Sequence, residues 1–261
     1  MGPLLARADV VAKYIVDRLR HGVPEVLGSV DHEVLFLVDG VGRFQAGALM
    51  ARRALREMNS DIGTILYDWQ TPIFGEVFSD LMWHRRNRLM GVKLGRKLLT
   101  FRRQHPETRI HILAFSGGAG IAIFGLEALR GRSLIDTLIL ACPAISSAYN
   151  FAPALHAVQR CYALTSHRDS IILGLGTRIF GTTDRRHESA GGRVGFRIPP
   201  DASQEDTDAY GRMRQIRWSP DLRKLGHTGG HTGWAGAKLL HKHLMPLLRG
   251  DPQLPTHEVS R

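Results

Sequence analysis

One serine of this chain stands where its hydroxyl could act as a nucleophile. The run Ile110–Phe115 is apolar and partly β-branched, which predicts a buried strand, and Ser116 follows it directly. Small residues at 117–120 and a helix-like run to Leu129 come next. A strand, a serine, small residues and a helix make up the nucleophile-elbow pattern, in which a sharp turn lifts the hydroxyl above the edge of the sheet.

The composition around Ser116 has a steric reason. At such a turn the strand and the helix nearly touch, so the positions two before and two after the serine must be small. Here they are Ala114 and Gly118. The N-terminus of the following helix directs free N–H groups at the site, and the Gly117 N–H is placed to bind an oxyanion. Ala114 replaces the usual first glycine of the motif, so the match is imperfect. The alternative is that these residues form only a tight strand-to-helix turn.

Four local patterns together resemble the α/β-hydrolase family, over about residues 34–248. They are the strand ending in Asp39-Gly40-Val41-Gly42, the elbow at Ser116, the strand end Ser166-His167-Arg168-Asp169, and a Gly-His pair before the last helix. In that family the nucleophile, the acid and the histidine follow one another in this order, which assigns these roles to Ser116, Asp169 and His231. The resemblance implies a serine hydrolase that cleaves an ester or thioester through an acyl-Ser116 intermediate.

The resemblance gives each residue type a task. A serine hydroxyl is a weak nucleophile until a base removes its proton, and a neutral histidine can do this and later protonate the leaving group. A carboxylate at a strand end holds the imidazole in the right tautomer and stabilises its charged form. The N–H of Gly117 and one from the Gly40–Gly42 loop, with Val41 and Gly40 as candidates, would stabilise the oxyanion.

Two of these assignments keep an alternative. His227 has the same Gly-His-Thr-Gly setting as His231, so either histidine is a candidate base. Asp184 is the second candidate acid. The two histidines also have a His-x-x-x-His spacing, but a metal-binding pair of this kind needs a helix, and Gly229 and Gly230 oppose one. We therefore expect no metal and no cofactor.

Two departures from the family keep other functions open. Asp39 stands where many lipases and esterases carry a histidine before the glycine, and Ala114 replaces a glycine, which leaves room for a catalytically silent binding protein of the same fold. Nucleotide binding is a third possibility, because Gly40-x-Gly42 begins a dinucleotide fingerprint and Asp68 ends the next strand. Gln45 occupies the place of the third glycine of that fingerprint, which opposes this interpretation.

The order of elements predicts the fold class. Apolar runs predict strands at 34–38, 62–67, 110–115, 134–145, 160–165 and 215–218, and helical periodicity predicts helices at 4–20, 44–58, 80–104 and 234–248. Strands that alternate with helices indicate a single-domain three-layer α/β sandwich, with a mainly parallel sheet and helices on both faces. An amphipathic helix within residues 1–30 is expected to pack on the 31–250 body. That body contains an irregular excursion at 181–215, and a polar tail follows at 251–261.

Composition and charge exclude several classes of protein. Hydrophobic residues make up 43% of the 261 residues, too much for disorder, and Cys142 and Cys161 give no disulfide framework, so a reducing, cytoplasmic setting is expected. Charged residues interrupt the N-terminal segment, which therefore lacks a signal-peptide pattern, and the longest apolar stretch is too short to span a bilayer. The net charge of +11 allows an anionic partner. No nucleic-acid-binding signature accompanies the charge, so nucleic acid is not expected.

One segment concentrates the positive charge. The helix predicted at 80–104, which Ser79 or Asp80 could cap, has basic residues throughout and no acidic residue after Asp80. A solvated helix face is the simple interpretation of this pattern. The alternative is contact with an anionic surface through Arg85, Arg86, Arg88, Arg96 and Lys97.

Overall fold

The computed structural model describes residues 23–42, 45–71, 80, 82–170, 172–173, 182–187 and 189–260. The helix predicted at 4–20 and most of the loop at 71–80 lie outside these residues, as does part of the 181–215 excursion.

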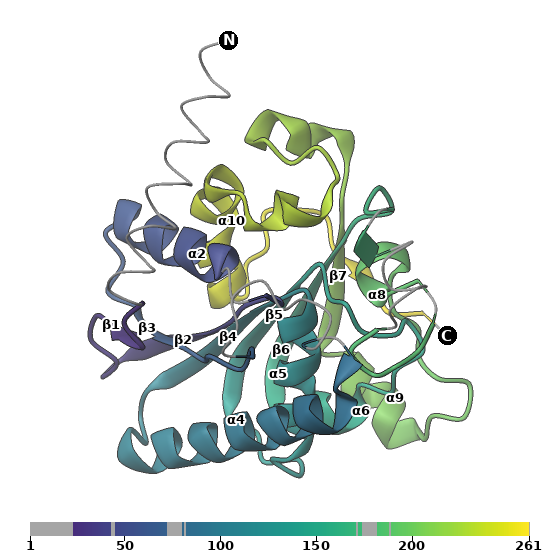
Figure 1. Cartoon of the computed structure of the whole chain (residues 1–261), viewed down its shortest axis with the longest axis horizontal. Helices are drawn as coiled ribbons and strands as arrows, with labels where there is room; N and C mark the ends of the chain where they lie inside the picture. The colour runs from purple at the N-terminus through teal and green to yellow at the C-terminus, as the bar shows by residue number, and fades with distance from the viewer. Residues whose placement is uncertain are drawn as a thin grey trace.

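A single sheet forms the centre of the described part (Figure 1). Its strand order is β1-β3-β2-β4-β5-β6-β7-β8. The strands are β1 (Val26–Leu27), β2 (Glu33–Val38), β3 (Gly63–Leu66), β4 (Arg109–Phe115), β5 (Ile135–Ala141), β6 (Val158–Thr165), β7 (Met213–Arg217) and β8 (His257–Glu258). Strands β2 to β7 are parallel, and only the short edge strands β1 and β8 pair antiparallel. Parallel strands are buried on both faces, which is why they were visible in the sequence as apolar runs.

Helices cover both faces of the sheet, so the predicted three-layer α/β fold is confirmed. In Figure 1, α2 (Ala46–Glu57) and α10 (Ala237–Arg249) lie on one side of the strands. On the other side lie α4 (His84–Gln104), α5 (Gly117–Glu127) and α6 (Ala152–Leu155). The shorter helices α8 (Gly191–Val194) and α9 (Gln204–Tyr210) follow β6 in the chain.

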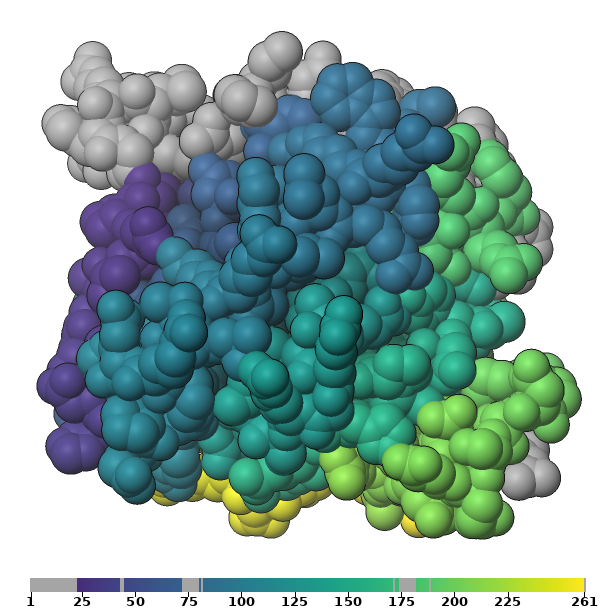
Figure 2. All heavy atoms as spheres, turned by 90° about the horizontal axis from the view of Figure 1, so that it is seen from below, coloured from purple at the N-terminus to yellow at the C-terminus, as the bar shows by residue number. Residues whose placement is uncertain are grey.

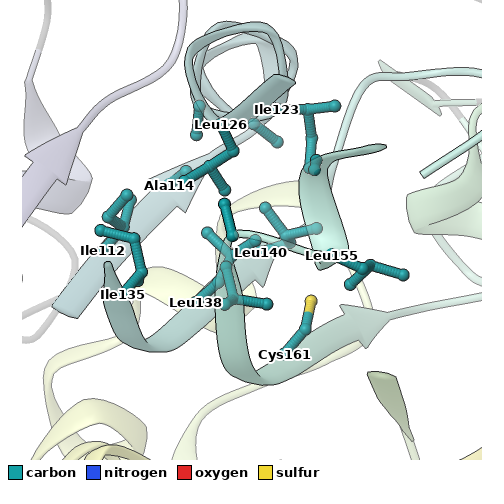
Figure 3. Close-up of a cluster of buried hydrophobic side chains, with 14 of the residues drawn as sticks. Ile112, Ala114, Ile123, Leu126, Ile135, Leu138, Leu140, Leu155 and Cys161 are labelled. Carbon is teal, nitrogen blue, oxygen red and sulfur yellow. The ribbon is translucent and has the colours of Figure 1, made fainter. Parts of the chain in front are cut away.

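The core beneath α5 fixes the position of the elbow. Side chains of β4 and β5 such as Ile112 and Leu138 meet Ile123 and Leu126 of α5 in one buried cluster (Figure 3). All residues from Gly117 to Leu126 are buried, so α5 is enclosed by the sheet and α4.

Two glycines let α4 approach α5 closely. A Cβ atom at Gly91 would lie 2.4 Å from Phe124 Cβ, and one at Gly95 would lie 2.6 Å from the Gly125 carbonyl oxygen. Such distances are well below van der Waals contact, so glycine is required at both positions. The Ser116-bearing helix is thus held between two packed layers.

Three sequence predictions need correction. Helix α4 begins at His84, and Asp80 does not cap it, because the Asp80 carboxylate binds other segments. The described part of the 181–215 excursion contains α8 and α9, the latter capped by the Ser203 side chain. The predicted polar tail contributes β8, whose residues pair with β7, because a two-residue polar edge strand has no apolar pattern that a sequence could reveal.

Candidate active site

Ser116 lies at a strained turn between β4 and α5. Its backbone has φ 49° and ψ −121°, a conformation that non-glycine residues rarely adopt and that is found mainly where function requires it. A Cβ atom at Gly118 would lie 2.3 Å from the Asp39 carbonyl oxygen and 2.4 Å from that of Val38. The contact between helix and neighbouring strand therefore excludes any side chain at position 118, as the sequence indicated.

A continuous chain of hydrogen bonds joins Ser116, His231 and Asp169. The Ser116 Oγ lies 2.9 Å from His231 Nε2, and His231 Nδ1 lies 2.6 Å from Asp169 Oδ2. Because a carboxylate only accepts, Nδ1 carries a proton and donates it, and in the neutral imidazole Nε2 accepts from the serine hydroxyl. The three residues predicted from different parts of the chain are thus brought together.

Each of the three side chains projects from the same edge of the sheet. Ser116 follows β4, Asp169 lies in the loop after β6, and His231 begins the 3-10 helix His231–Ala235 before α10. The hydroxyl of Ser166 donates to the Gly229 carbonyl at 2.6 Å, which ties the loop of the acid to the loop of the histidine. Asp169 is 2% exposed, so its interaction with His231 is largely shielded from water.

The surroundings of His231 favour its protonated form. Burial lowers the pKa of this imidazole, but the Cys142 sulfur and the Asp169 carboxylate together outweigh burial and raise the pKa above its usual value. Cys142 follows β5 directly, and its φ of 44° is again in the left-handed region. The sequence had shown Cys142 only as an unpaired cysteine, because nothing in its flanks indicates that it lies beside His231.

His227, the alternative base, belongs to the core. It is fully buried, its ring packs edge-on against Trp234 at 4.7 Å, and its Nδ1 accepts a hydrogen bond from the Gly229 N–H at 3.1 Å. Burial lowers the pKa of His227 to about 4. A Cβ atom at Gly233 would lie 1.7 Å from His227 Nδ1, so the ring occupies the space beside that glycine. His227 is not hydrogen-bonded to Ser116 or Asp169.

Asp184, the alternative acid, has other partners. Its Oδ1 accepts hydrogen bonds from the Ser146 N–H at 2.9 Å and from the Thr182 hydroxyl at 2.6 Å. These bonds hold the segment 182–187 against the residues that follow β5. The structure therefore brings Asp169, and not Asp184, to the imidazole.

The backbone N–H groups near Ser116 that have no hydrogen-bond partner in the described part of the chain include two from different segments. One belongs to Gly117, the first residue of α5, and the other to Val41. The two residues adjoin, since a Cβ atom at Gly117 would lie 2.9 Å from Val41 Cγ1. Gly40, also a candidate donor from the sequence, lies beside Ser116, but its N–H donates to Asp39 Oδ1 at 2.7 Å and is occupied.

Side chains from distant segments fix the loop that carries Val41. The Asp80 carboxylate accepts from the Gly42 N–H at 2.9 Å and from the Thr71 N–H at 2.7 Å, and it is fully buried. Gln70 Nε2 donates to the Gly40 carbonyl at 2.6 Å. Two more bonds hold the same loop: Trp69 Nε1 donates to the Asp39 carbonyl, and Asp39 Oδ2 accepts from the Ala48 N–H. We call the four residues that make these bonds the loop clamp: Asp39, Trp69, Gln70 and Asp80.

The loop clamp also bears on the nucleotide alternative. A dinucleotide site presents free backbone N–H groups of a glycine-rich loop to phosphate. Here carboxylates already occupy the N–H groups of Gly40 and Gly42. The buried carboxylates of Asp39 and Asp80 hold this loop, and their negative charges would repel an anionic ligand at that position.

No cluster of three or more metal-ligating side chains occurs among the described residues. None of the described helices combines the length and the apolar character that crossing a bilayer requires.

Comparisons with known proteins found only solved structures of low sequence identity. No protein-family model and no curated protein sequence matches the chain. An esterase from Pyrococcus furiosus aligns over 82% of this chain and 84% of its own, with 12% identity and a TM-score of 0.41. A cutinase-like protein from Cryptococcus sp. aligns over 86% and 94%, with 12% identity and a TM-score of 0.38. A carboxylesterase from Bacillus subtilis aligns over 86% of each chain, with 11% identity and a TM-score of 0.38.

Proposed function

We propose that this protein is a serine hydrolase of the α/β-hydrolase type, which cleaves a carboxylic ester or thioester through an acyl-Ser116 intermediate. The observation that carries the proposal is the hydrogen-bonded chain from Ser116 Oγ through His231 to Asp169, with distances of 2.9 and 2.6 Å. Nucleophile, base and orienting acid within hydrogen-bond reach are the geometric signature of an activated serine.

In the acylation step, Ser116 Oγ bonds to the carbonyl carbon of the substrate while His231 Nε2 takes the hydroxyl proton. The carbonyl electron pair moves onto oxygen, and the N–H groups of Gly117 and Val41 stabilise the resulting oxyanion. When the tetrahedral intermediate collapses, the bond to the leaving oxygen or sulfur breaks, and His231 gives its proton to that atom. Asp169 keeps Nδ1 protonated and stabilises the imidazolium throughout.

In the deacylation step, water takes the place of the serine hydroxyl. His231 Nε2 accepts a proton from water as the hydroxide bonds to the acyl carbon, and the same two N–H groups stabilise the second oxyanion. Collapse releases the carboxylic acid and returns the proton to Ser116 Oγ. The cycle therefore consumes one water and leaves the protein unchanged.

The environment of His231 favours a second candidate function. The Cys142 sulfur and the Asp169 carboxylate outweigh burial and raise the pKa of His231, which favours the imidazolium, and an imidazolium cannot accept a proton from Ser116. A chain held in that form would be a binding protein with the same fold and no catalysis. The two candidates differ in whether Ser116 reacts with an acylating or phosphonylating reagent.

A fluorophosphonate probe tests the proposal. We expect covalent label on Ser116, located by peptide mass spectrometry, at a rate that rises with pH above about 6.5, because only neutral His231 can accept the serine proton. His231→Ala should slow labelling by roughly 10³-fold or more, and Asp169→Asn by a similar factor.

Matched variants define the controls for this experiment. His227→Asn should label at close to the normal rate in protein that remains folded, since His227 does not contact Ser116. Ser116→Ala should take no label. A folded protein that stays unlabelled over the whole pH range would overturn the hydrolase mechanism and favour the silent binding protein.

A further inference from the structure

Three large apolar side chains lie exposed at the beginning of α4. Met82, Trp83 and Leu89 are 53%, 58% and 52% exposed. They are three of seven exposed large hydrophobic residues in the described part of the chain, and all three fall within the stretch 82–89. Exposed apolar residues that occur singly need no explanation, but a cluster of them indicates a surface that binds a partner.

Basic residues share this exposed face with the apolar ones. Arg85, Leu89, Lys93 and Arg96 follow one another at spacings of four, four and three residues, which places them on one side of a helix. The opposite side of α4, which includes Asn87, Leu94 and Leu98, is buried. We call the exposed residues Met82, Trp83, Arg85, Leu89, Lys93 and Arg96 the α4 face. Figure 2 looks at this side of the molecule, where the blue-to-teal spheres of α4 lie at the surface.

The positive charges of the α4 face have no internal counter-ion. Arg85, Lys93 and Arg96 form no ion pair in the described structure, and no acidic residue occurs in the sequence from 81 to 106. Other basic residues of α4 are engaged: Arg88 pairs with Glu127, and Lys97 pairs with Glu25. Of the cations without an ion pair, Arg85 lies between Trp83 and Leu89 in the chain, and Lys93 and Arg96 follow Leu89 along the same side of the helix.

A hollow continues the α4 face toward the segment after α5. It has a volume of about 490 Å³, and its basic lining residues are Arg96, Arg130 and Arg132. Apolar side chains such as Val92 and Leu99 form the rest of its wall, and no carboxylate lines it. Guanidinium groups above apolar walls suit a molecule with an anionic head and an apolar body.

We propose that the α4 face docks on the surface of an anionic phospholipid bilayer, with Trp83, Met82 and Leu89 inserted among the lipids and the unpaired cations against the headgroup phosphates. Interfacial helices combine these two features, and basic residues near an anionic membrane add to the apolar contribution. A nucleic acid would satisfy the charges but would leave Met82 and Leu89 in water. The bilayer is therefore the partner that accounts for both the exposed apolar side chains and the positive charges of the α4 face.

The first residues of the α4 face are connected through a short stretch of chain to the loop beside Ser116. Trp83 follows Asp80 closely in the chain, and the Asp80 carboxylate binds the Gly42 N–H of the loop beside Ser116. Docking through Met82 and Trp83 would therefore bring the edge of the sheet that carries Ser116 toward the lipid surface. The inference itself rests on the α4 face alone and does not depend on the proposed hydrolase activity.

Tryptophan fluorescence with vesicles tests the docking directly. Trp69, Trp218 and Trp234 are at most 5% exposed, so a change in emission on adding vesicles reports Trp83. We expect a blue shift and co-sedimentation with phosphatidylcholine vesicles that contain about 30% phosphatidylglycerol, and both should weaken as salt rises. Pure phosphatidylcholine vesicles should bind at least ~10-fold more weakly.

Two variants and two matched controls make the test specific to the α4 face. Trp83→Ser with Met82→Ser, and Arg85→Glu with Arg96→Glu, should each weaken binding to anionic vesicles at least ~10-fold while circular dichroism stays unchanged. Val26→Ser, at an exposed apolar position of β1, and Arg56→Glu on α2 should bind normally. Binding to neither vesicle, equal binding to both, normal binding by both variants, or tight binding of duplex DNA without vesicle binding would overturn the proposal.

Discussion

Two histidines in the same tetrapeptide setting have opposite environments. His231 donates to the Asp169 carboxylate and has a raised pKa, whereas His227 packs against Trp234 and has a pKa lowered to about 4 by burial. The tetrapeptide Gly-His-Thr-Gly is identical at both positions, so the sequence favoured His231 only by its place directly before the last helix. The two pKa values differ because, after folding, the His231 ring faces the loop of Asp169 and the His227 ring faces Trp234.

The buried neutral form of His227 predicts a loss of stability in acid. Its pKa is about 4 in the folded protein and near 6.5 in the unfolded chain, so the unfolded state binds the proton first as pH falls. The free energy of unfolding should therefore drop as pH falls from about 6.5 to about 4. Between about pH 7.5 and pH 5, the protonation of His227 should lower the free energy of unfolding by about 2 kcal/mol.

Urea unfolding of wild type and His227→Asn at both pH values measures this contribution of His227 to the free energy of unfolding. The variant should be less stable at neutral pH, because it loses contact with Trp234, but it should lose about 2 kcal/mol less than wild type on acidification. His167→Asn, at an exposed position, should keep the full wild-type dependence. A variant at position 227 that titrates like wild type would show that another group is responsible.

Among the elements, the loop after β2 depends on contacts that come from distant parts of the chain. The clamp residues Trp69, Gln70 and Asp80 follow it by about 30 to 40 positions, and together they leave the Val41 N–H free while the Gly40 and Gly42 N–H groups are occupied. The strands that carry the site were predictable because parallel strands are apolar throughout. The clamp was not, because a polar residue gives no sign in sequence of which distant N–H it will bind.

Removal of the Asp80 carboxylate should lower both the stability of the fold and the reactivity of Ser116. Asp80→Ala leaves the N–H groups of Gly42 and Thr71 without acceptors, which costs about 1–3 kcal/mol for each buried donor. The loop can then move, and displacement of one oxyanion donor typically lowers the rate by 10²-fold or more. We expect fluorophosphonate labelling of Ser116 to slow accordingly in protein that is folded by circular dichroism.

A carboxylate elsewhere provides the comparison for Asp80. Glu127 binds Arg88 and the Tyr149 hydroxyl on the α4 side of the sheet, away from the loop. Glu127→Gln should therefore change the melting temperature without changing the labelling rate. Equal labelling of Asp80→Ala and wild type would mean that the loop holds its position without the clamp.

On the scale of the whole molecule, the excess of positive charge makes the folded state sensitive to salt. The chain carries 35 Lys and Arg residues against 24 Asp and Glu residues, a net charge of +11. Compaction brings like charges together, and this repulsion opposes folding. The ion pairs of the described surface, such as Arg53 with Glu57 and Lys224 with Asp221, are exposed and contribute little.

Stability and membrane docking should therefore respond to salt in opposite directions. Raising salt from about 10 mM to about 150 mM shortens the Debye length from about 30 Å to about 8 Å, which screens the repulsion. We expect the free energy of unfolding in urea to rise by on the order of 1 kcal/mol, while binding to anionic vesicles falls. Arg85→Glu with Arg96→Glu lowers the net charge from +11 to +7, since each change removes two charges, so this variant should gain less from salt. A fall in stability with salt would instead mean that local ion pairs outweigh the general repulsion.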